Sequence, residues 1–169
     1  MNEKYYPLVK HYYETKGDDS TGMFQAIRLM AEEGRLDDAL ECLEQCVTEK
    51  RLSWWEESGK SLEGTGNPLM DGYRLFYESY LGLSIPRDGE IIEATGRELV
   101  TRWWNRCPTL EACQKLGLDT REICRKVYQQ PVQVLLMKID PRLRFRRNYA
   151  ALRPYTPYCE EIIALEGSD

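Results

Sequence analysis

The 169-residue chain lacks most of the features that would place it in a common functional class. No run approaches the roughly 18 consecutive apolar residues of a membrane span, and residues 1–10 lack the apolar stretch of a signal peptide. The nucleotide-binding patterns GxGxxG and GxxxxGKS/T and the hydrolase patterns HExxH and GxSxG are absent. His11 is the one histidine, so a metal site or a Ser/His/Asp site has a single imidazole to use. We therefore expect a cytoplasmic protein without a membrane segment.

Positive charge is scarce in the first half of the chain and in excess in the second. Residues 1–96 carry 10 basic and 19 acidic side chains, whereas residues 97–169 carry 13 basic and 9 acidic ones, for a net charge of −5. Nucleic-acid modules are usually basic overall, and membrane-surface modules need a basic amphipathic helix. We therefore expect no nucleic-acid and no membrane partner. The expected partner is a small-molecule carboxylate bound by the C-terminal half. The sequence leaves open whether the chain forms a homo-oligomer.

Six cysteines in a chain without a secretion signal favour a reducing compartment, where cysteines are core residues, nucleophiles or metal ligands. Cys42 and Cys46 lie one helical turn apart in an apolar stretch and are predicted to be core residues. No cofactor is predicted. The alternative is zinc or an iron–sulfur cluster, although zinc-ligand pairs usually stand roughly two to four residues apart. The candidate metal ligands are Cys107, Cys113, Cys124 and Cys159.

The apolar spacing of the first third predicts helices over residues 5–16, 23–34 and 36–47, the last two forming an antiparallel pair with a turn at Gly34. Residues 58–72 are rich in Gly, Ser, Asn and Pro and are typical of a connector. We therefore expect a helical segment at residues 1–66 and an α+β domain at residues 67–169.

The remaining pattern predicts a small antiparallel sheet with packed helices. Asp119 and Glu122 form a predicted capping box that starts a helix at Thr120. Pro131 is expected either to kink that helix or to start another over residues 132–138. The further helices are expected at residues 69–81 and 109–116, the strands at residues 90–95, 97–105 and 142–149, and a strand or short helix at residues 158–165. The predicted fold class is α+β, with an N-terminal helical segment followed by the sheet.

Arginines alternate with apolar residues in the predicted strand 142–149. Residues two apart point to the same side of a strand, so Arg142, Arg144 and Arg146 are expected to project together, opposite Leu143 and Phe145. Guanidinium groups are rigid donor forks that match carboxylate or phosphate, so the pattern indicates an anion site. The alternative is a solvated edge-strand face, paired with Glu residues.

Cys107 is the best candidate nucleophile. It precedes the helix predicted at residues 109–116, which Thr109 can cap, and the positive end of the helix dipole together with Arg106 favours a thiolate there. The alternative is a structural cysteine in a tight turn. Aromatic side chains, Trp104 among them, could roof a small pocket, although core packing is the default for aromatic residues at this spacing.

Three segments of the C-terminal half resemble a known family. NRCPTLEACQKLGLDTREIC, PVQVLLMKIDPRLRFRRNY and RPYTPYCEEII, within residues 98–163, are similar to the C-terminal part of 2-aminothiazoline-4-carboxylate hydrolase-like proteins. The likeness consists of the Cys-Pro pair, the spaced cysteines, the Pro-Arg-Leu-Arg-Phe strand and the Arg-Pro-Tyr turn. It implies that water opens a sulfur-containing amidine ring on the way to cysteine.

Such a reaction needs a carboxylate anchor, a nucleophile and an acid for the leaving nitrogen or sulfur. The catalytic candidates are Cys107 as nucleophile and Tyr158 and Glu160 for proton transfer, with Tyr155 as a further donor. The candidates for substrate binding are Arg142, Arg144, Arg146, Arg153, Trp104 and Tyr155.

Two other functional classes stay open. One is a non-enzymatic, sensor-type module that binds a ligand or a metal through the C-terminal cysteines. The other is an interaction protein whose N-terminal helix pair docks on a partner. The predicted hydrolase would act on or bind a carboxylate-bearing compound that contains sulfur or nitrogen.

Overall fold

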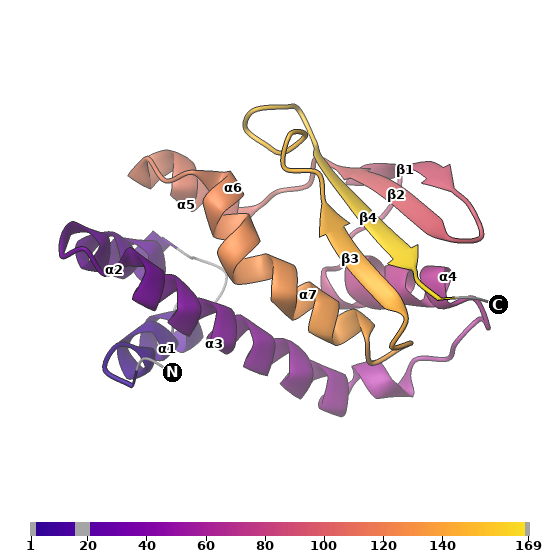
Figure 1. Ribbon diagram of the computed structural model, residues 1–169, viewed down its shortest axis with the longest axis horizontal. Coiled ribbons are helices and arrows are strands. Elements are labelled where there is room, and N and C mark those ends of the chain that lie inside the picture. The colour runs from indigo at the N-terminus through magenta and orange to yellow at the C-terminus, as the bar shows by residue number, and fades with distance from the viewer. Residues whose placement is uncertain (1–2, 16–20, 168–169) are drawn as a thin grey trace. The chain divides into compact units, whose positions relative to one another are not determined.

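The computed structural model describes residues 3–15 and 21–167, and it has an α+β fold with one four-stranded antiparallel sheet (Figure 1). The predicted fold class is confirmed. The chain divides into two compact units, one from residues 1–50 and 106–131 and the other from residues 51–105 and 132–169. The predicted domain boundary at residue 66 stays a prediction. Within the described ranges, no helix has both the length and the apolar character needed to cross a bilayer.

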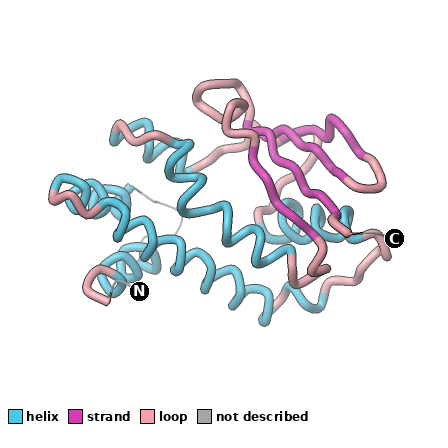
Figure 2. Tube along the Cα trace, viewed as in Figure 1, coloured by secondary structure: helices cyan, strands magenta, loops and turns pink. Residues whose placement is uncertain are grey.

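The first unit is built from helices, which Figure 2 shows as coiled tubes. Gly34, at φ +75°, makes the predicted turn between the second and third helices. The third helix continues past its predicted end at residue 47, because the chain meets no helix-breaking residue before Ser58 and Gly59. The helices are α1 (Tyr6–Thr15), α2 (Thr21–Glu32), the part of α3 (Leu36–Glu57) up to residue 50, α5 (Pro108–Leu116) and α6 (Thr120–Ile123).

The core of this unit is apolar and includes three of the cysteines. Burial raises the pKa of the Cys46 thiol to about 12 and also raises that of Cys42. Both thiols are therefore neutral core groups, as the sequence predicts. The largest fully buried side chains of this core are Met23, Phe24, Ile27, Leu40, Leu43 and Ile123.

The helix that begins at Thr120 passes through a π-helical turn before it reaches Pro131. Asp119 Oδ1 accepts from the Arg121 backbone N–H at 2.9 Å, so the predicted cap is confirmed. Glu122, the reach-back acid of the predicted capping box, accepts from Lys126 at 3.0 Å. The turn, η3 (Cys124–Tyr128), leads into α7 (Gln129–Leu136), which carries Pro131 inside it. Proline has no N–H and crowds the preceding turn, and the wider π turn accommodates this.

The second unit contains the sheet, with strand order β1-β2-β4-β3 and antiparallel pairing throughout. The predicted hairpin is confirmed, and the C-terminal segment, left open between strand and helix, is a strand. A bulge interrupts the pairing between Ile91 and Glu93. The strands are β1 (Gly89–Ala94), β2 (Glu98–Trp103), β3 (Leu143–Arg147) and β4 (Cys159–Leu165).

One face of the sheet packs against helices of the same unit. These are α4 (Pro68–Tyr73), the π-helix η2 (Arg74–Tyr80) that continues it, and the end of α7. Asn67 caps α4, its side-chain oxygen accepting from the backbone N–H groups of Leu69 and Met70 at 3.1 and 3.3 Å. The core between helices and sheet is formed by Tyr73, Leu75, Phe76, Tyr77, Leu99, Trp103, Val132, Leu135, Leu136, Leu143, Phe145 and Ile163.

Candidate functional site

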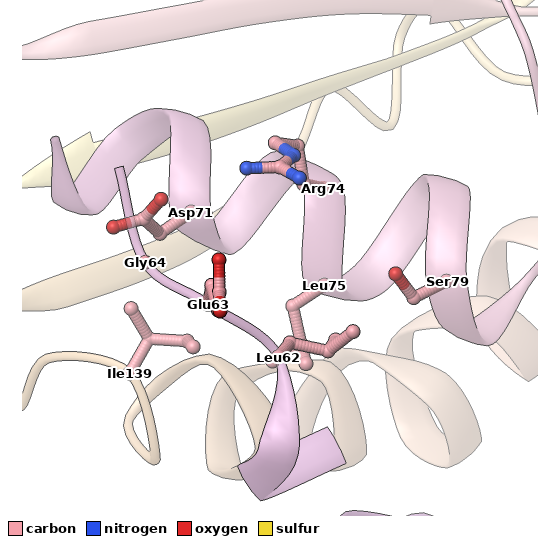
Figure 3. A pocket seen from close by; sticks show the side chains of 8 residues that line it. All are labelled: Leu62, Glu63, Gly64, Asp71, Arg74, Leu75, Ser79 and Ile139. Atoms are coloured by element: carbon pink, nitrogen blue, oxygen red, sulfur yellow. The ribbon is translucent and has the colours of Figure 1, made fainter. Parts of the chain in front are cut away.

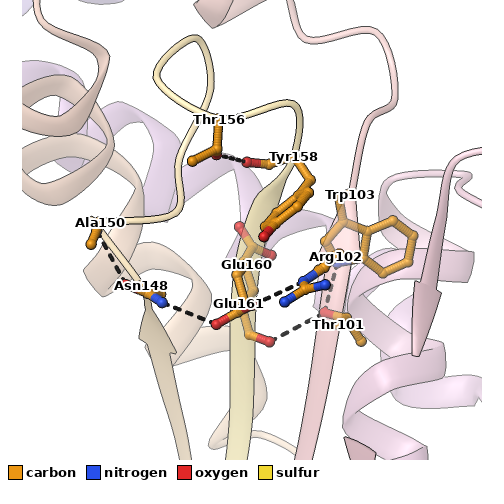
Figure 4. A network of polar contacts seen from close by, with 9 residues as sticks. All are labelled: Thr101, Arg102, Trp103, Asn148, Ala150, Thr156, Tyr158, Glu160 and Glu161. Atoms are coloured by element: carbon orange, nitrogen blue, oxygen red, sulfur yellow. Dashed lines mark hydrogen bonds and ion pairs between the residues drawn. The ribbon is translucent and has the colours of Figure 1, made fainter. Parts of the chain in front are cut away.

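Polar side chains gather at one end of the sheet, where β2 ends and β4 begins (Figure 4). Glu160 accepts two hydrogen bonds there, from Arg102 Nε to Oε2 and from Asn148 Nδ2 to Oε1, each at 3.0 Å. The Arg102 guanidinium also lies over the ring of Tyr158, 4.3 Å from its centroid. The structure thus brings together Tyr158 and Glu160, both predicted to transfer protons. We call Arg102, Asn148, Tyr158 and Glu160 the sheet-end cluster.

The sheet-end cluster holds Glu160 in its ionised form. The hydrogen bond from Asn148 and the charge and hydrogen bond of Arg102 lower the pKa of the Glu160 carboxyl. The carboxyl is therefore a poor proton donor near neutral pH, and it serves better as a fixed acceptor. The other proton-transfer candidate in the cluster is Tyr158, whose phenol carries an O–H group that can donate a proton.

A second polar network lies on the other face of the same strands, against the helices. Glu161 accepts from Tyr77 Oη at 2.8 Å and from Arg147 Nε at 2.7 Å. Thr101 Oγ1 accepts from Trp103 Nε1 at 2.8 Å and donates to the Glu161 carbonyl at 3.3 Å. Burial, together with the charge of Glu161, raises the pKa of Tyr77 well above its ordinary value. Tyr77 therefore stays a proton donor to the buried side chain of Glu161.

Cys159 begins β4 and has an arginine beside it. Arg153 Nε donates to Cys159 Sγ at 3.4 Å, and Arg153 Nη1 donates to the Asn105 carbonyl at 2.6 Å. Both Cys159 and Arg153 are half-buried. Arg153 was predicted to bind substrate, whereas Cys159 was considered only as a metal ligand. The structure therefore places a thiol and a guanidinium together at the sheet end.

Two aromatic candidates for substrate binding lie in the segments that flank this thiol. Trp104 follows β2 and donates from Nε1 to the Arg87 carbonyl at 3.0 Å, with 42% of its surface exposed. Tyr155 lies in the connection between β3 and β4 and is 51% exposed. Neither ring belongs to the core, so both are accessible to a ligand.

Each of the three alternating arginines is paired with an acidic side chain. Arg142 precedes β3 and contacts Asp140 at 2.9 Å, and Arg144 Nε contacts Glu166 at 2.8 Å. Arg146 pairs with Glu98 of β2. Leu143 and Phe145 are buried as predicted, and β3 is an edge strand. These contacts match the solvated, acid-paired edge face, while a role of the three arginines in binding substrate stays a prediction.

Cys107 lies in the first unit, at the start of α5. It is the N-cap residue, since its Sγ accepts from the Leu110 backbone N–H at 3.4 Å. The predicted cap at Thr109 is wrong, because Thr109 lies inside the helix and donates to Tyr128 Oη at 3.1 Å. Arg106 forms a two-pronged ion pair with Glu111, at 3.0 and 3.1 Å, which offsets the charge expected to act on Cys107. The role of Cys107 as nucleophile stays a prediction.

The candidate metal ligands are divided between the units. Cys107, Cys113 and Cys124 belong to the first unit and Cys159 to the second. Burial, together with the neighbouring Cys124 and Cys107, raises the pKa of Cys113 to about 12. Across residues 3–15 and 21–167, no group of three or more His, Cys, Asp or Glu side chains is placed to hold a metal ion. The zinc or iron–sulfur alternative stays a prediction.

Sequence analysis missed Arg102, Asn148 and Glu161. The adjacent acids Glu160 and Glu161 could have indicated this arrangement, because neighbouring residues of a strand point to opposite faces. One of the two carboxylates therefore faces the core, where it needs a buried cation as a partner.

Comparisons with family models, curated proteins and solved structures give no match to this chain. The resemblance of residues 98–163 to the 2-aminothiazoline-4-carboxylate hydrolase-like family stays a prediction from its motifs.

Proposed function

We propose that the chain is a small hydrolase that acts on a carboxylate-bearing compound containing sulfur and nitrogen, in a reducing compartment such as the cytoplasm. The observation that carries this proposal is the 3.4 Å contact between Arg153 Nε and Cys159 Sγ. Six free cysteines support the reducing compartment. The motifs of residues 98–163 supply the substrate class, a cyclic amidine that bears a carboxylate.

Cys159 is the proposed nucleophile. A cation beside a thiol stabilises negative charge on sulfur, and Arg153 provides that cation. The Cys159 thiolate adds to the amidine carbon, and the ring C–S bond breaks, so that the ring sulfur leaves as a thiolate. Water then adds to the same carbon and displaces Cys159, leaving a urea. The net reaction consumes one water and needs no oxidant or reductant.

Arg153 and the sheet-end cluster have separate tasks in this reaction. A guanidinium carries five N–H donors, so Arg153 can contact sulfur and a substrate carboxylate at once. The Tyr158 phenol gives a proton to the leaving ring sulfur and recovers it from water. Glu160 stays ionised and fixes Arg102, on which the Tyr158 ring stacks, so Glu160 acts as a positioning residue.

The test is thiol release from 2-aminothiazoline-4-carboxylate by the purified chain. We expect turnover by the wild type and a loss of about hundredfold or more in kcat for Cys159→Ser. Cys124→Ser, at another half-buried cysteine, is the matched control and should keep full activity. Cys107→Ser separates the two nucleophile hypotheses. Loss of turnover in Cys107→Ser with full turnover in Cys159→Ser would overturn the assignment to Cys159.

A second candidate function is ligand binding without chemistry. It is favoured by the lowered pKa of Glu160, which removes one proton donor from the sheet end. In that case the wild type binds the carboxylate compound saturably without releasing thiol, and Cys159→Ser binds it equally well. The metal-binding form of this alternative predicts about one zinc or iron per chain in protein purified without oxygen.

A further inference from the structure

The second unit has an open cleft that shares no residue with the sheet end (Figure 3). The space in it that water-sized molecules can fill is about 30 Å³, so a larger ligand stays partly exposed in its open mouth. The cleft is lined by Leu62, Glu63, Gly64, Asp71, Arg74, Leu75, Ser79 and Ile139.

The cleft carries charges of both signs. Glu63 forms no hydrogen bond and no ion pair with any residue of the ranges 3–15 and 21–167, and Arg74 only a loose pair. In that pair Arg74 Nε stands 3.9 Å from Glu78 Oε2, beyond hydrogen-bond distance, and both side chains are about half exposed. A carboxylate and a guanidinium on one cleft are therefore available to a ligand that carries both charges.

Asp71 is fixed in place at the edge of the cleft. Its Oδ1 accepts from the backbone N–H and the hydroxyl of Thr65, each at 2.7 Å. Gly64 leaves room for the other oxygen, because a Cβ at Gly64 would stand 3.2 Å from Asp71 Oδ2. The connector is thus held against α4, and a second carboxylate oxygen faces the space around Gly64.

The remainder of the cleft is apolar and rests on unusual backbone. Leu75 is fully buried, and Leu62 and Ile139 lie on the side away from Arg74 in Figure 3. Arg74, Leu75 and Ser79 all belong to the π-helix η2. π-Helical turns are rare and are found often at functional sites. The cleft therefore combines paired charges, a small apolar surface and a backbone irregularity.

We propose that this cleft binds a zwitterion of amino-acid size with an aliphatic body, at a site separate from the proposed hydrolytic one. Arg74 binds the carboxylate of the zwitterion, and Glu63 with Asp71 binds its ammonium group. The aliphatic body lies on Leu62 and Ile139. Because none of these residues belongs to the sheet end, the inference does not depend on the proposed hydrolysis.

Calorimetric titration of the full chain with three related compounds tests the proposal. L-Valine carries both charges, N-acetyl-L-valine lacks the cation, and L-valinamide lacks the anion. We expect saturable binding of L-valine in the millimolar range and binding about tenfold or more weaker for each analogue. Absence of saturable binding of L-valine up to about 20 mM overturns the proposal.

Two variants test which residue binds the carboxylate of L-valine and which binds its ammonium group. Arg74→Gln should weaken L-valine about tenfold or more and leave L-valinamide unchanged, whereas Glu63→Gln should weaken L-valine and leave N-acetyl-L-valine unchanged. Arg28→Gln is the matched control, because Arg28 also pairs loosely with a glutamate one turn later, Glu32 at 3.5 Å. Equal affinity of Arg74→Gln and Arg28→Gln for L-valine contradicts the proposal, whatever the outcome for hydrolysis.

Discussion

Arg147 donates from Nε to Glu161 Oε1 at 2.7 Å on the core face of the sheet, where the two side chains are only 9% and 10% exposed. Tyr77 donates to the other carboxylate oxygen at 2.8 Å. A buried carboxylate keeps its charge only while such donors are present. The pair therefore joins β3, β4 and the π-helix η2 through one anion.

Removing the cation of this pair should destabilise the fold strongly. Arg147→Met leaves the buried Glu161 carboxyl without its cation, and we expect a loss of about 3–5 kcal/mol in the free energy of unfolding. Arg147→Met combined with Glu161→Gln should recover part of that loss, because no buried charge remains. Urea denaturation followed by circular dichroism measures all three proteins.

The neighbouring arginine provides the control for this effect. Arg146 pairs with Glu98 on the opposite face, with 57% and 41% of the two side chains exposed. Because solvent screens such a pair, Arg146→Met should cost less than about 1 kcal/mol. If Arg146→Met and Arg147→Met cost the same, the buried pair does not have the role described.

These two adjacent arginines show what the sequence could and could not predict. Strand alternation correctly predicts that Leu143 and Phe145 are buried, and that Arg144 and Arg146 share the other face. It does not identify the partner of each guanidinium, since Glu98 and Glu166 come from elsewhere in the chain. Pairing across strands depends on the strand order, which alternation alone does not fix.

The six cysteines should differ widely in reactivity toward iodoacetamide at pH 8. Cys46 and Cys113, with pKa values raised to about 12, are thiolate in roughly one molecule in ten thousand at this pH. Cys159 is half-buried beside Arg153 and should be labelled at least about a hundredfold faster. Mass spectrometry of peptides from the native protein gives each rate.

Arg153→Gln tests whether the guanidinium causes the difference. Labelling of Cys159 should slow severalfold in this variant, because the positive charge beside sulfur is lost. Labelling of Cys124 should be unchanged and reports on the integrity of the fold. An unchanged rate at Cys159 removes Arg153 from the explanation and weakens the proposed hydrolase.

Cys107 should behave as a helix cap in stability measurements. Cys107→Ala removes the acceptor for the Leu110 N–H and should cost about 0.5–2 kcal/mol, whereas Cys107→Ser provides a better acceptor and should match or exceed the wild type. The thermal unfolding of the three proteins measures the difference. Equal stability of Cys107→Ala and Cys107→Ser contradicts a capping role.

The same residue marks a limit of sequence analysis. The Cys-Pro pair before a helical stretch correctly places Cys107 at a helix start. The pattern does not show that Arg106 is already paired with Glu111 or that sulfur is the cap, since both depend on side-chain geometry. Cys159 was predicted only as a metal ligand, because its arginine partner lies six residues earlier in a connection that no periodicity describes.

Acid should remove the contribution of Glu160 to stability. The pKa of Glu160 is lowered in the folded chain from its ordinary value of 4.5, so the folded state favours the carboxylate. The resulting stabilisation is present above about pH 4.5 and is lost as the pH falls through the lowered value. Glu160→Gln does not titrate, so its deficit relative to the wild type should be about 1 kcal/mol at pH 7 and shrink below pH 4.5. Urea denaturation between pH 7 and pH 3 measures this.

Glu166→Gln separates this effect from general acid sensitivity. Glu166 pairs with Arg144 but is 63% exposed, whereas Glu160 is 15% exposed beside Arg102. Solvent screens the exposed pair, so Glu166→Gln should differ from the wild type by less than about 0.5 kcal/mol at any pH in the range. A deficit of Glu160→Gln that stays constant from pH 7 to pH 3 would mean that Asn148 and Arg102 do not hold this carboxylate in its charged form.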